Sequence, residues 1–177
     1  MQIDRRRTLL FVLACGVLSA VSAAAVVVAL TGSLQSRIRQ LEDQDQIRQL
    51  LIDYARHLDA RDLAAYSALF AADGEWAGGS GSARGPANIQ AFMEKALGAG
   101  PNRDGSYHLM SSFAITVAGD EATAFSRWTY VVPRPGGTAT MQGSHYDDTL
   151  VRENGAWKFK RRVASSDPVR PSAPAQK

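Results

Sequence analysis

The stretch GDEATAFSRWTYVV, residues 119–132, decides the fold class of this chain. It opens with Gly119-Asp120, a dipeptide of the kind that forms tight hairpin turns. The residues after the turn are rich in threonine, valine and aromatic side chains, which favour strands. Residues 107–117, in front of the turn, have the same character. The pattern therefore predicts a hairpin of two strands, over 107–117 and 122–132.

A second hairpin is predicted directly after the first. Its strands cover residues 138–151 and 156–163, and Glu153-Asn154-Gly155 supplies the turn. Four consecutive strands joined by short turns form a meander of long antiparallel strands.

The residues before 107 have helical periodicity instead. A stripe of apolar residues at helical spacing predicts an amphipathic helix, made by Ile38, Leu41, Ile47, Leu50, Leu51, Tyr54 and Leu58. Shorter helices are predicted over 63–71 and, from Pro86 onward, over 86–97. Between them Asp73-Gly74 predicts a turn into a short strand, 75–77, with a loop or hairpin tip at 78–82. Helices followed by an antiparallel meander indicate an α+β domain.

The N-terminal segment predicts a membrane anchor. Residues 9–30 carry no charge and are mostly Leu, Val, Ala and Phe, and about 20 such residues in a helix cross a bilayer. Arg5-Arg6-Arg7 favours a cytoplasmic N-terminus, with a single-pass helix and an extracytoplasmic domain. Two alternatives are a signal peptide cleaved near Ala23-Ala24-Ala25, with secretion of the domain, and a lipoprotein signal ending at Cys15.

Four parts of the chain follow from these patterns. They are a cytoplasmic stub with the anchor (1–33), a helical stalk (34–46), the α+β domain (47–166) and a disordered tail (167–177). The net charge of +3 does not indicate nucleic-acid binding. Without Asp4 and Arg5–Arg7, the 20 basic and 17 acidic residues become 17 and 16. The single cysteine, Cys15, excludes a disulfide within the chain.

The domain resembles SnoaL-like proteins of the nuclear-transport-factor-2-like superfamily, over about residues 41–165. The matching segments follow in order along the chain: 54–62, 69–76, 84–86 with Ile89 and Phe92, His108, 119–122, Gly143, Tyr146, Asp148, Leu150 and 155–162. The resemblance implies a cone-shaped fold, in which a curved antiparallel sheet wraps around three helices and leaves a deep pocket. It also implies a homodimer.

Members of this family include scytalone dehydratase, bile acid dehydratases, ketosteroid isomerases, polyketide cyclases and non-catalytic binding domains. The resemblance implies a lyase or isomerase that acts on a hydrophobic hydroxylated or keto compound, steroid-like or polyketide-like, without metal or organic cofactor. The alternative is a non-catalytic ligand-binding or dimerisation module on a membrane stalk, because a fold alone does not assign chemistry.

Three residues match positions that bile acid dehydratases use: Tyr54, Asp59 and His108. The resemblance implies that His108 is the general base or acid, since histidine can exchange a proton near neutral pH. Asp59 would orient and charge-stabilise its imidazole, and Tyr54 would donate a hydrogen bond to the substrate oxygen. Structural interpretations stay open: Tyr54 as a core residue, Asp59 as a helix cap and His108 as an ordinary strand residue.

Six further residues are expected to contact the substrate: Trp76, Phe92, Met110, Trp128, His145 and Arg162. The first four are apolar or aromatic, as a hydrophobic ligand requires. His145 is included because scytalone dehydratase uses a pair of histidines, but strict alternation along the strand places it opposite Tyr146 and Asp148. Arg162 matches the family's closing arginine, and its alternative role is a salt bridge to Asp148. Together with His57, the histidines lack the spacing of a zinc site.

Overall fold

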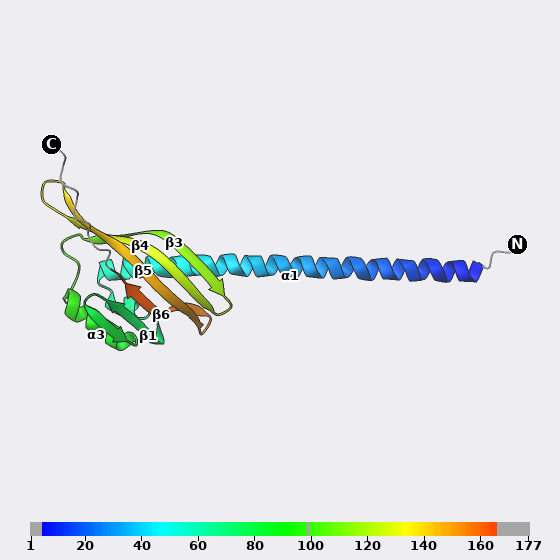
Figure 1. Ribbon diagram of the computed structural model, residues 1–177, viewed down its shortest axis with the longest axis horizontal. Coiled ribbons are helices and arrows are strands. Elements are labelled where there is room, and N and C mark those ends of the chain that lie inside the picture. The colour runs from blue at the N-terminus through cyan, green and yellow to red at the C-terminus, as the bar shows by residue number, and fades with distance from the viewer. Residues whose placement is uncertain (1–4, 99, 166–177) are drawn as a thin grey trace, which may run out of the picture. The chain divides into compact units, whose positions relative to one another are not determined.

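The computed structural model describes the backbone of residues 5–98 and 100–165, and the side chains of 30–98 and 100–165. Contacts divide the chain into two compact units, Met1–Glu42 and Asp43–Lys177. Helix α1, Arg5–Ala60, contributes to both units (Figure 1). The predicted disordered tail, 167–177, lies outside the described residues.

The N-terminal unit consists of the first part of α1. No helix in the described part of the chain is long and apolar enough to cross a membrane. Side chains 9–29 of the expected anchor lie outside the described residues, so the anchor stays a prediction. In the predicted stripe, Ile38 and Leu41 are exposed. The buried part of the stripe begins at Ile47.

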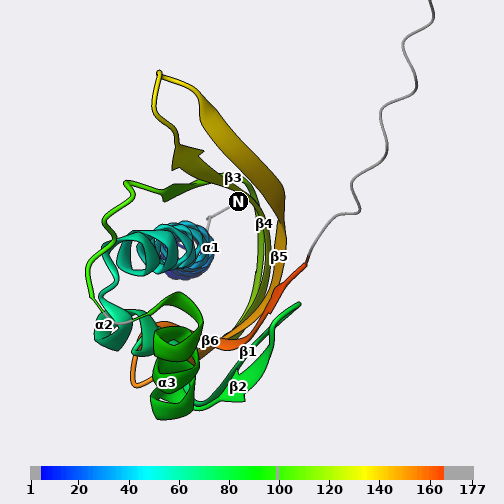
Figure 2. The ribbon, with the colours of Figure 1, turned by 90° about the vertical axis from the view of Figure 1, so that its left-hand side faces the viewer.

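The second unit is built on a curved six-stranded sheet, with the end of α1 and the helices α2 and α3 on its concave side (Figure 2). The strand order is β2-β1-β6-β5-β4-β3. The strands are β1 (Phe70–Gly78), β2 (Gly81–Arg84), β3 (Tyr107–Ala118), β4 (Glu121–Pro133), β5 (Ala139–Glu153) and β6 (Ala156–Ala164). The α+β class and the antiparallel meander from β3 to β6 are confirmed.

The sheet is not wholly antiparallel, which corrects the expectation from the family. β1 pairs with β6 in parallel, with Trp76 opposite Arg162. A parallel partner that lies far along the chain leaves no turn signal in the sequence, so the pattern of local turns did not predict this pairing.

The segment 63–78 differs from its predicted structure. Helix α2 covers only Leu63–Ser67, and β1 begins at Phe70 instead of residue 75. Asp73-Gly74 is not a turn before the strand but lies at an irregularity inside it, where the β1–β6 register shifts. A Cβ at Gly74 would lie 2.6 Å from the carbonyl oxygen of Phe159. Only glycine therefore allows the two strands to approach here.

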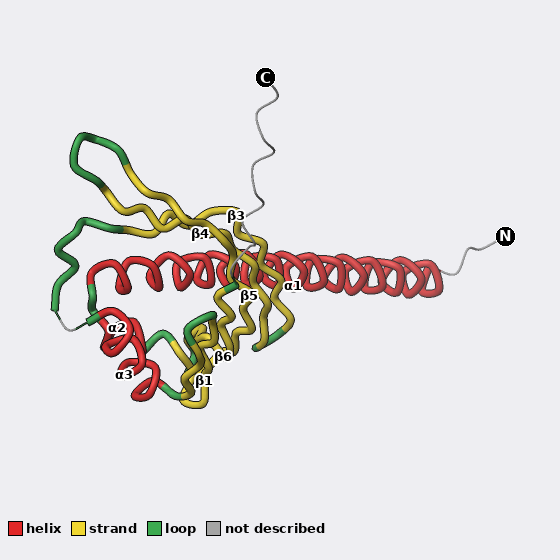
Figure 3. Tube along the Cα trace, turned by 60° about the vertical axis from the view of Figure 1, so that its left-hand side comes forward, coloured by secondary structure: helices red, strands yellow, loops and turns green. Residues whose placement is uncertain are grey.

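Helix α3, Pro86–Leu97, has the predicted bounds. Proline stands at its first turn, and Ile89 and Met93 form its buried face. From residue 100 onward, the loop between α3 and β3 runs past the C-terminal end of α1 to the start of β3 (Figure 3).

An arginine lies in the centre of the aromatic core. Arg162 is fully buried and forms two hydrogen bonds to Asp148, at 2.7 and 2.8 Å. Its guanidinium lies 3.9–4.2 Å from the ring centroids of Tyr54, Tyr146 and Phe159. Burial alone would lower the pKa of the Arg162 guanidinium, but the Asp148 carboxylate raises it above its usual value. Arg162 is therefore a cation enclosed by one carboxylate and three aromatic faces.

Candidate functional site

A cavity of about 280 Å³ opens between the helices and the concave face of the sheet. Its walls are mostly apolar and come from α1, β1, α3, β3, β4, β5 and the loops between them. They are formed by Tyr54, Leu58, Asp59, Arg61, Trp76, Ser80, Phe92, Met93, Ala96, Leu97, Asn102, Ser106, His108, Trp128, Tyr130, Gln142 and Tyr146. A concave apolar site with a few polar groups is typical of small-molecule binding.

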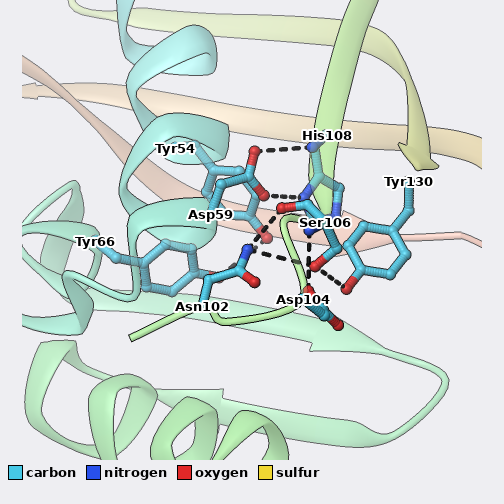
Figure 4. A network of polar contacts seen from close by, with 8 residues as sticks. All are labelled: Tyr54, Asp59, Tyr66, Asn102, Asp104, Ser106, His108 and Tyr130. Atoms are coloured by element: carbon cyan, nitrogen blue, oxygen red, sulfur yellow. Dashed lines mark hydrogen bonds and ion pairs between the residues drawn. The ribbon is translucent and has the colours of Figure 1, made fainter. Parts of the chain in front are cut away.

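Asp59 and His108 form a hydrogen-bonded pair in this cavity (Figure 4). Oδ1 of Asp59 lies 2.6 Å from Nδ1 of His108, and Oδ2 accepts a hydrogen bond of 2.8 Å from the His108 backbone N–H. Both side chains are mostly buried, with 20% and 14% exposed. A carboxylate only accepts, so Nδ1 carries the ring proton. The other nitrogen, Nε2, has no hydrogen bond to any described residue and is left to act on a ligand.

The position of the pair follows from two chain segments that meet there. Asp59 is the second-last residue of α1, and His108 is the second residue of β3. The His108 ring packs against Tyr130, at 4.7 Å between ring centroids, and lies 6.0 Å from the Trp128 ring. With Asp59 holding both its ring and its backbone, His108 has little freedom to rotate.

Tyr54 reaches the same cavity from one turn earlier on α1. Its hydroxyl accepts hydrogen bonds of 3.0 Å from the Trp76 indole N–H and from the Tyr66 hydroxyl. Burial raises the pKa of Tyr66 well above its usual value, so its hydroxyl stays protonated and able to donate. With both lone pairs engaged, the Tyr54 hydroxyl keeps its own proton to donate to a ligand.

The loop before β3 contributes residues that the sequence did not single out. Asn102 Nδ2 donates to the Ser106 carbonyl at 2.6 Å, and Asp104 accepts from the Ser106 N–H at 2.9 Å. The Tyr130 hydroxyl donates to Ser106 Oγ at 2.7 Å, which fixes the loop to β4 (Figure 4). Asn, Asp and Ser commonly form such local hydrogen bonds in loops. That composition was the signal that could have identified them.

The predicted substrate-contacting residues are divided by the structure. Trp76, Phe92 and Trp128 line the cavity, the first two with ring centroids 5.2 Å apart. Met110 does not: it lies farther along β3, opposite Trp128, and packs against the core. A contact between Met110 and a substrate therefore stays a prediction.

His145 and Arg162 are also not among the residues that line the cavity. His145 stacks on Phe125, with centroids 5.4 Å apart, on the face of β5 opposite Tyr146. Strict alternation along β5 is the reason. Arg162 lies beneath the cavity wall in its salt bridge with Asp148, the alternative that the sequence left open.

The described residues contain no group of three or more His, Cys, Asp or Glu side chains that could hold a metal ion. The polar groups that face the cavity are instead of the kind that transfer protons or donate hydrogen bonds.

Comparison with solved structures gives the same fold. An NTF2-like protein with a cystatin-like fold from Novosphingobium aromaticivorans is 32% identical, with 75% of this chain and 87% of that chain covered and a TM-score of 0.67. A candidate scytalone dehydratase from the same organism is 26% identical (78% and 96% covered, TM-score 0.60). ActVI-ORFA from Streptomyces coelicolor is 25% identical (67% and 92% covered, TM-score 0.59).

None of the curated proteins compared with the chain matches it. The SnoaL-like domain, a family that includes cofactor-free dehydratases and isomerases, matches residues 39–163. That match takes in α1 from residue 39 onward, the whole sheet up to residue 163 and every residue of the cavity. The chain belongs to the SnoaL-like family.

Proposed function

We propose that this protein is a cofactor-independent lyase or isomerase that removes a proton beside a carbonyl group of a hydrophobic hydroxylated or keto compound. The observation that carries the proposal is the Asp59–His108 pair, held at 2.6 Å in an apolar cavity, with no described residue bonded to Nε2. A base oriented in this way and shielded from bulk water is suited to abstract a weakly acidic C–H proton.

His108 starts the reaction. Its Nε2 takes the proton from the carbon next to the carbonyl, and the electron pair of that C–H bond moves to form an enolate. Tyr54 donates a hydrogen bond to the carbonyl oxygen, on which negative charge develops. The site therefore stabilises the charged intermediate with a neutral donor.

The proton then leaves His108 in one of two ways. In a dehydration, a hydroxyl on the neighbouring carbon takes the proton and departs as water, while a carbon–carbon double bond forms. In an isomerisation, the proton returns to a different carbon. Asp59 keeps the ring in position and stabilises the imidazolium between the two transfers.

The substrate is inferred from the cavity walls. Trp76, Phe92 and Trp128 offer flat aromatic surfaces, which suit a fused-ring compound such as a steroid-like or polyketide-like ring system. The similarity to a candidate scytalone dehydratase supports a dehydration.

Deuterium exchange into 2-tetralone tests the proposal, because it requires only the base and the oxyanion donor. In heavy water, the protein should accelerate exchange beside the carbonyl above the rate in buffer, and His108→Ala should abolish that acceleration. His57→Ala is the matched control, since His57 does not line the cavity. If His108→Ala exchanges as fast as the unaltered chain, the proposed base is wrong. Saturable binding of the ketone without any exchange would favour a binding module instead.

A further inference from the structure

Arg61 is a cavity residue that the proposed reaction does not use. Of the described residues that line the cavity, it alone is an arginine or lysine. Its guanidinium makes no hydrogen bond or ion pair with any described residue. A cation at a ligand cavity with no partner among the described side chains points to a negative charge supplied by the ligand.

The backbone at Arg61 is unusual as well. α1 ends at Ala60, and Arg61 follows with φ of 59°, its N–H bonded to the Leu58 carbonyl at 3.1 Å. Glycine or asparagine adopts this left-handed conformation more readily than arginine. A cation here interacts favourably with the C-terminal end of the helix. That interaction accounts for a positive charge, but not for its place on the cavity wall.

Four described carboxylates lie near Arg61, and each is engaged elsewhere. Asp59 holds His108, and Asp62 accepts from the Ala65 N–H at the start of α2. Glu94 accepts from Gln90 on α3. Hydrogen bonds from Ser106 lower the pKa of Asp104, and the charge of Arg61 adds to that effect from farther away. None of these four carboxylates forms an ion pair with Arg61.

Arg61 also lines a second, shallow groove, which it shares with Leu63 of α2 and with Gln90 and Glu94 of α3. A residue common to the cavity and to a surface groove lies where the two meet, at the mouth. An ionic group bound there would keep part of its hydration, while the apolar body of the ligand enters among Trp76, Phe92 and Trp128.

We propose that Arg61 binds an acidic group of the substrate at the cavity mouth. The substrate would then be an apolar ring compound with an anionic substituent, and the planar guanidinium matches a carboxylate best. This inference rests on the proposed function, because only that reaction makes the bound compound a substrate. The contact itself concerns binding, and can be tested without turnover.

Two dyes that differ by one acidic group provide the test. 1-Anilinonaphthalene-8-sulfonate is an anion, and N-phenyl-1-naphthylamine is its uncharged parent. Each is titrated into the full-length chain, with binding followed by dye emission and by quenching of tryptophan, since Trp76 and Trp128 line the cavity. The parent should displace the sulfonate, as expected for a shared cavity. Two dyes that bind without competing would overturn the proposal.

Arg61→Gln should weaken the sulfonate about tenfold more than it weakens the parent, as expected for a lost charge-assisted contact that is partly hydrated. Arg61→Lys should restore part of the difference. Arg56→Gln is the matched control: it removes the same charge from an exposed side chain of α1 that pairs with Asp53. The proposal is overturned if Arg61→Gln changes both dyes equally, or if Arg56→Gln has the same selective effect. Neither result would contradict the proposed role of His108, because the deuterium-exchange experiment tests that role separately.

Discussion

Breaking the buried Arg162–Asp148 pair should strongly destabilise the domain. Neither side chain has exposed surface. Nε and Nη2 of Arg162 lie 2.7 and 2.8 Å from the two carboxylate oxygens of Asp148. Asp148→Asn removes the negative charge and leaves the guanidinium among three aromatic rings. Arg162→Met removes the cation and leaves a buried carboxylate.

The magnitude follows from the geometry. Two unit charges 2.7 Å apart attract by about 6 kcal/mol at an effective dielectric constant of about 20. Desolvation of both ions takes back part of this energy, so each single substitution should lower the free energy of unfolding by about 3–5 kcal/mol. That loss is a large share of the free energy of unfolding of a typical folded protein, which is about 5–15 kcal/mol.

Urea unfolding followed by tryptophan emission and far-ultraviolet circular dichroism measures the effect. The double variant Arg162→Met with Asp148→Val removes both charges, and should recover most of the stability lost in either single variant. If the double variant loses the sum of the two single losses, the pair is not coupled and the reasoning fails. Loss of ligand binding with unchanged stability would instead make Arg162 a substrate-binding residue.

Four other outcomes are expected. Tyr54→Phe should slow the exchange reaction less than the roughly hundredfold or greater loss expected for His108→Ala or Asp59→Asn; an equal loss would contradict the donor role. A hydrogen bond from Lys160 lowers the pKa of Asp73. The ionised Asp73 carboxylate therefore stabilises the folded domain above about pH 4, and this contribution is lost as the pH falls through the lowered pKa. In a plot of unfolding free energy against pH, Asp73→Asn should make the decrease at acidic pH less steep. The full chain expressed in a bacterium should resist carbonate extraction from membranes if residues 9–30 form an anchor; a soluble species that begins near Val26 would show cleavage instead. Light scattering on the full-length chain should report a homodimer at tens of micromolar, and a monomer would count against that assembly.

Local turn chemistry explains which elements could be predicted. Gly119-Asp120 and Asn154-Gly155 occupy the β3–β4 and β5–β6 turns, and Pro86 begins α3. Each of these signals depends only on neighbouring residues. By contrast, β1 depends on β6, far along the chain, and on the close approach at Gly74. No pattern within residues 63–78 indicates that approach. The predicted helix, 63–71, is therefore longer than α2, and the predicted strand, 75–77, is shorter than β1.

The candidate site shows the same division. Asp59 and His108 could be identified by their resemblance to a family, but the distance between them is set by the end of α1 and the start of β3, which meet only in the folded domain. Asn102, Ser106 and Arg61 could not be identified from spacing, because loop residues have no periodicity. Met110 shares a strand with His108 but is not among the residues that line the cavity, for a related reason. Alternation gives the face of a strand, but not how far along that face a cavity extends.

The core and the cavity are coupled through shared side chains. Tyr54 and Tyr146 line the cavity, and the guanidinium of Arg162 lies 3.9 and 4.1 Å from their ring centroids. A cation against the ring of Tyr54 also favours polarisation of its hydroxyl, which Trp76 and Tyr66 hold from the other side. Arg162 can therefore influence the proposed oxyanion donor without touching a ligand. The charge of Arg162 supports the position of Tyr54 as well as the stability of the core.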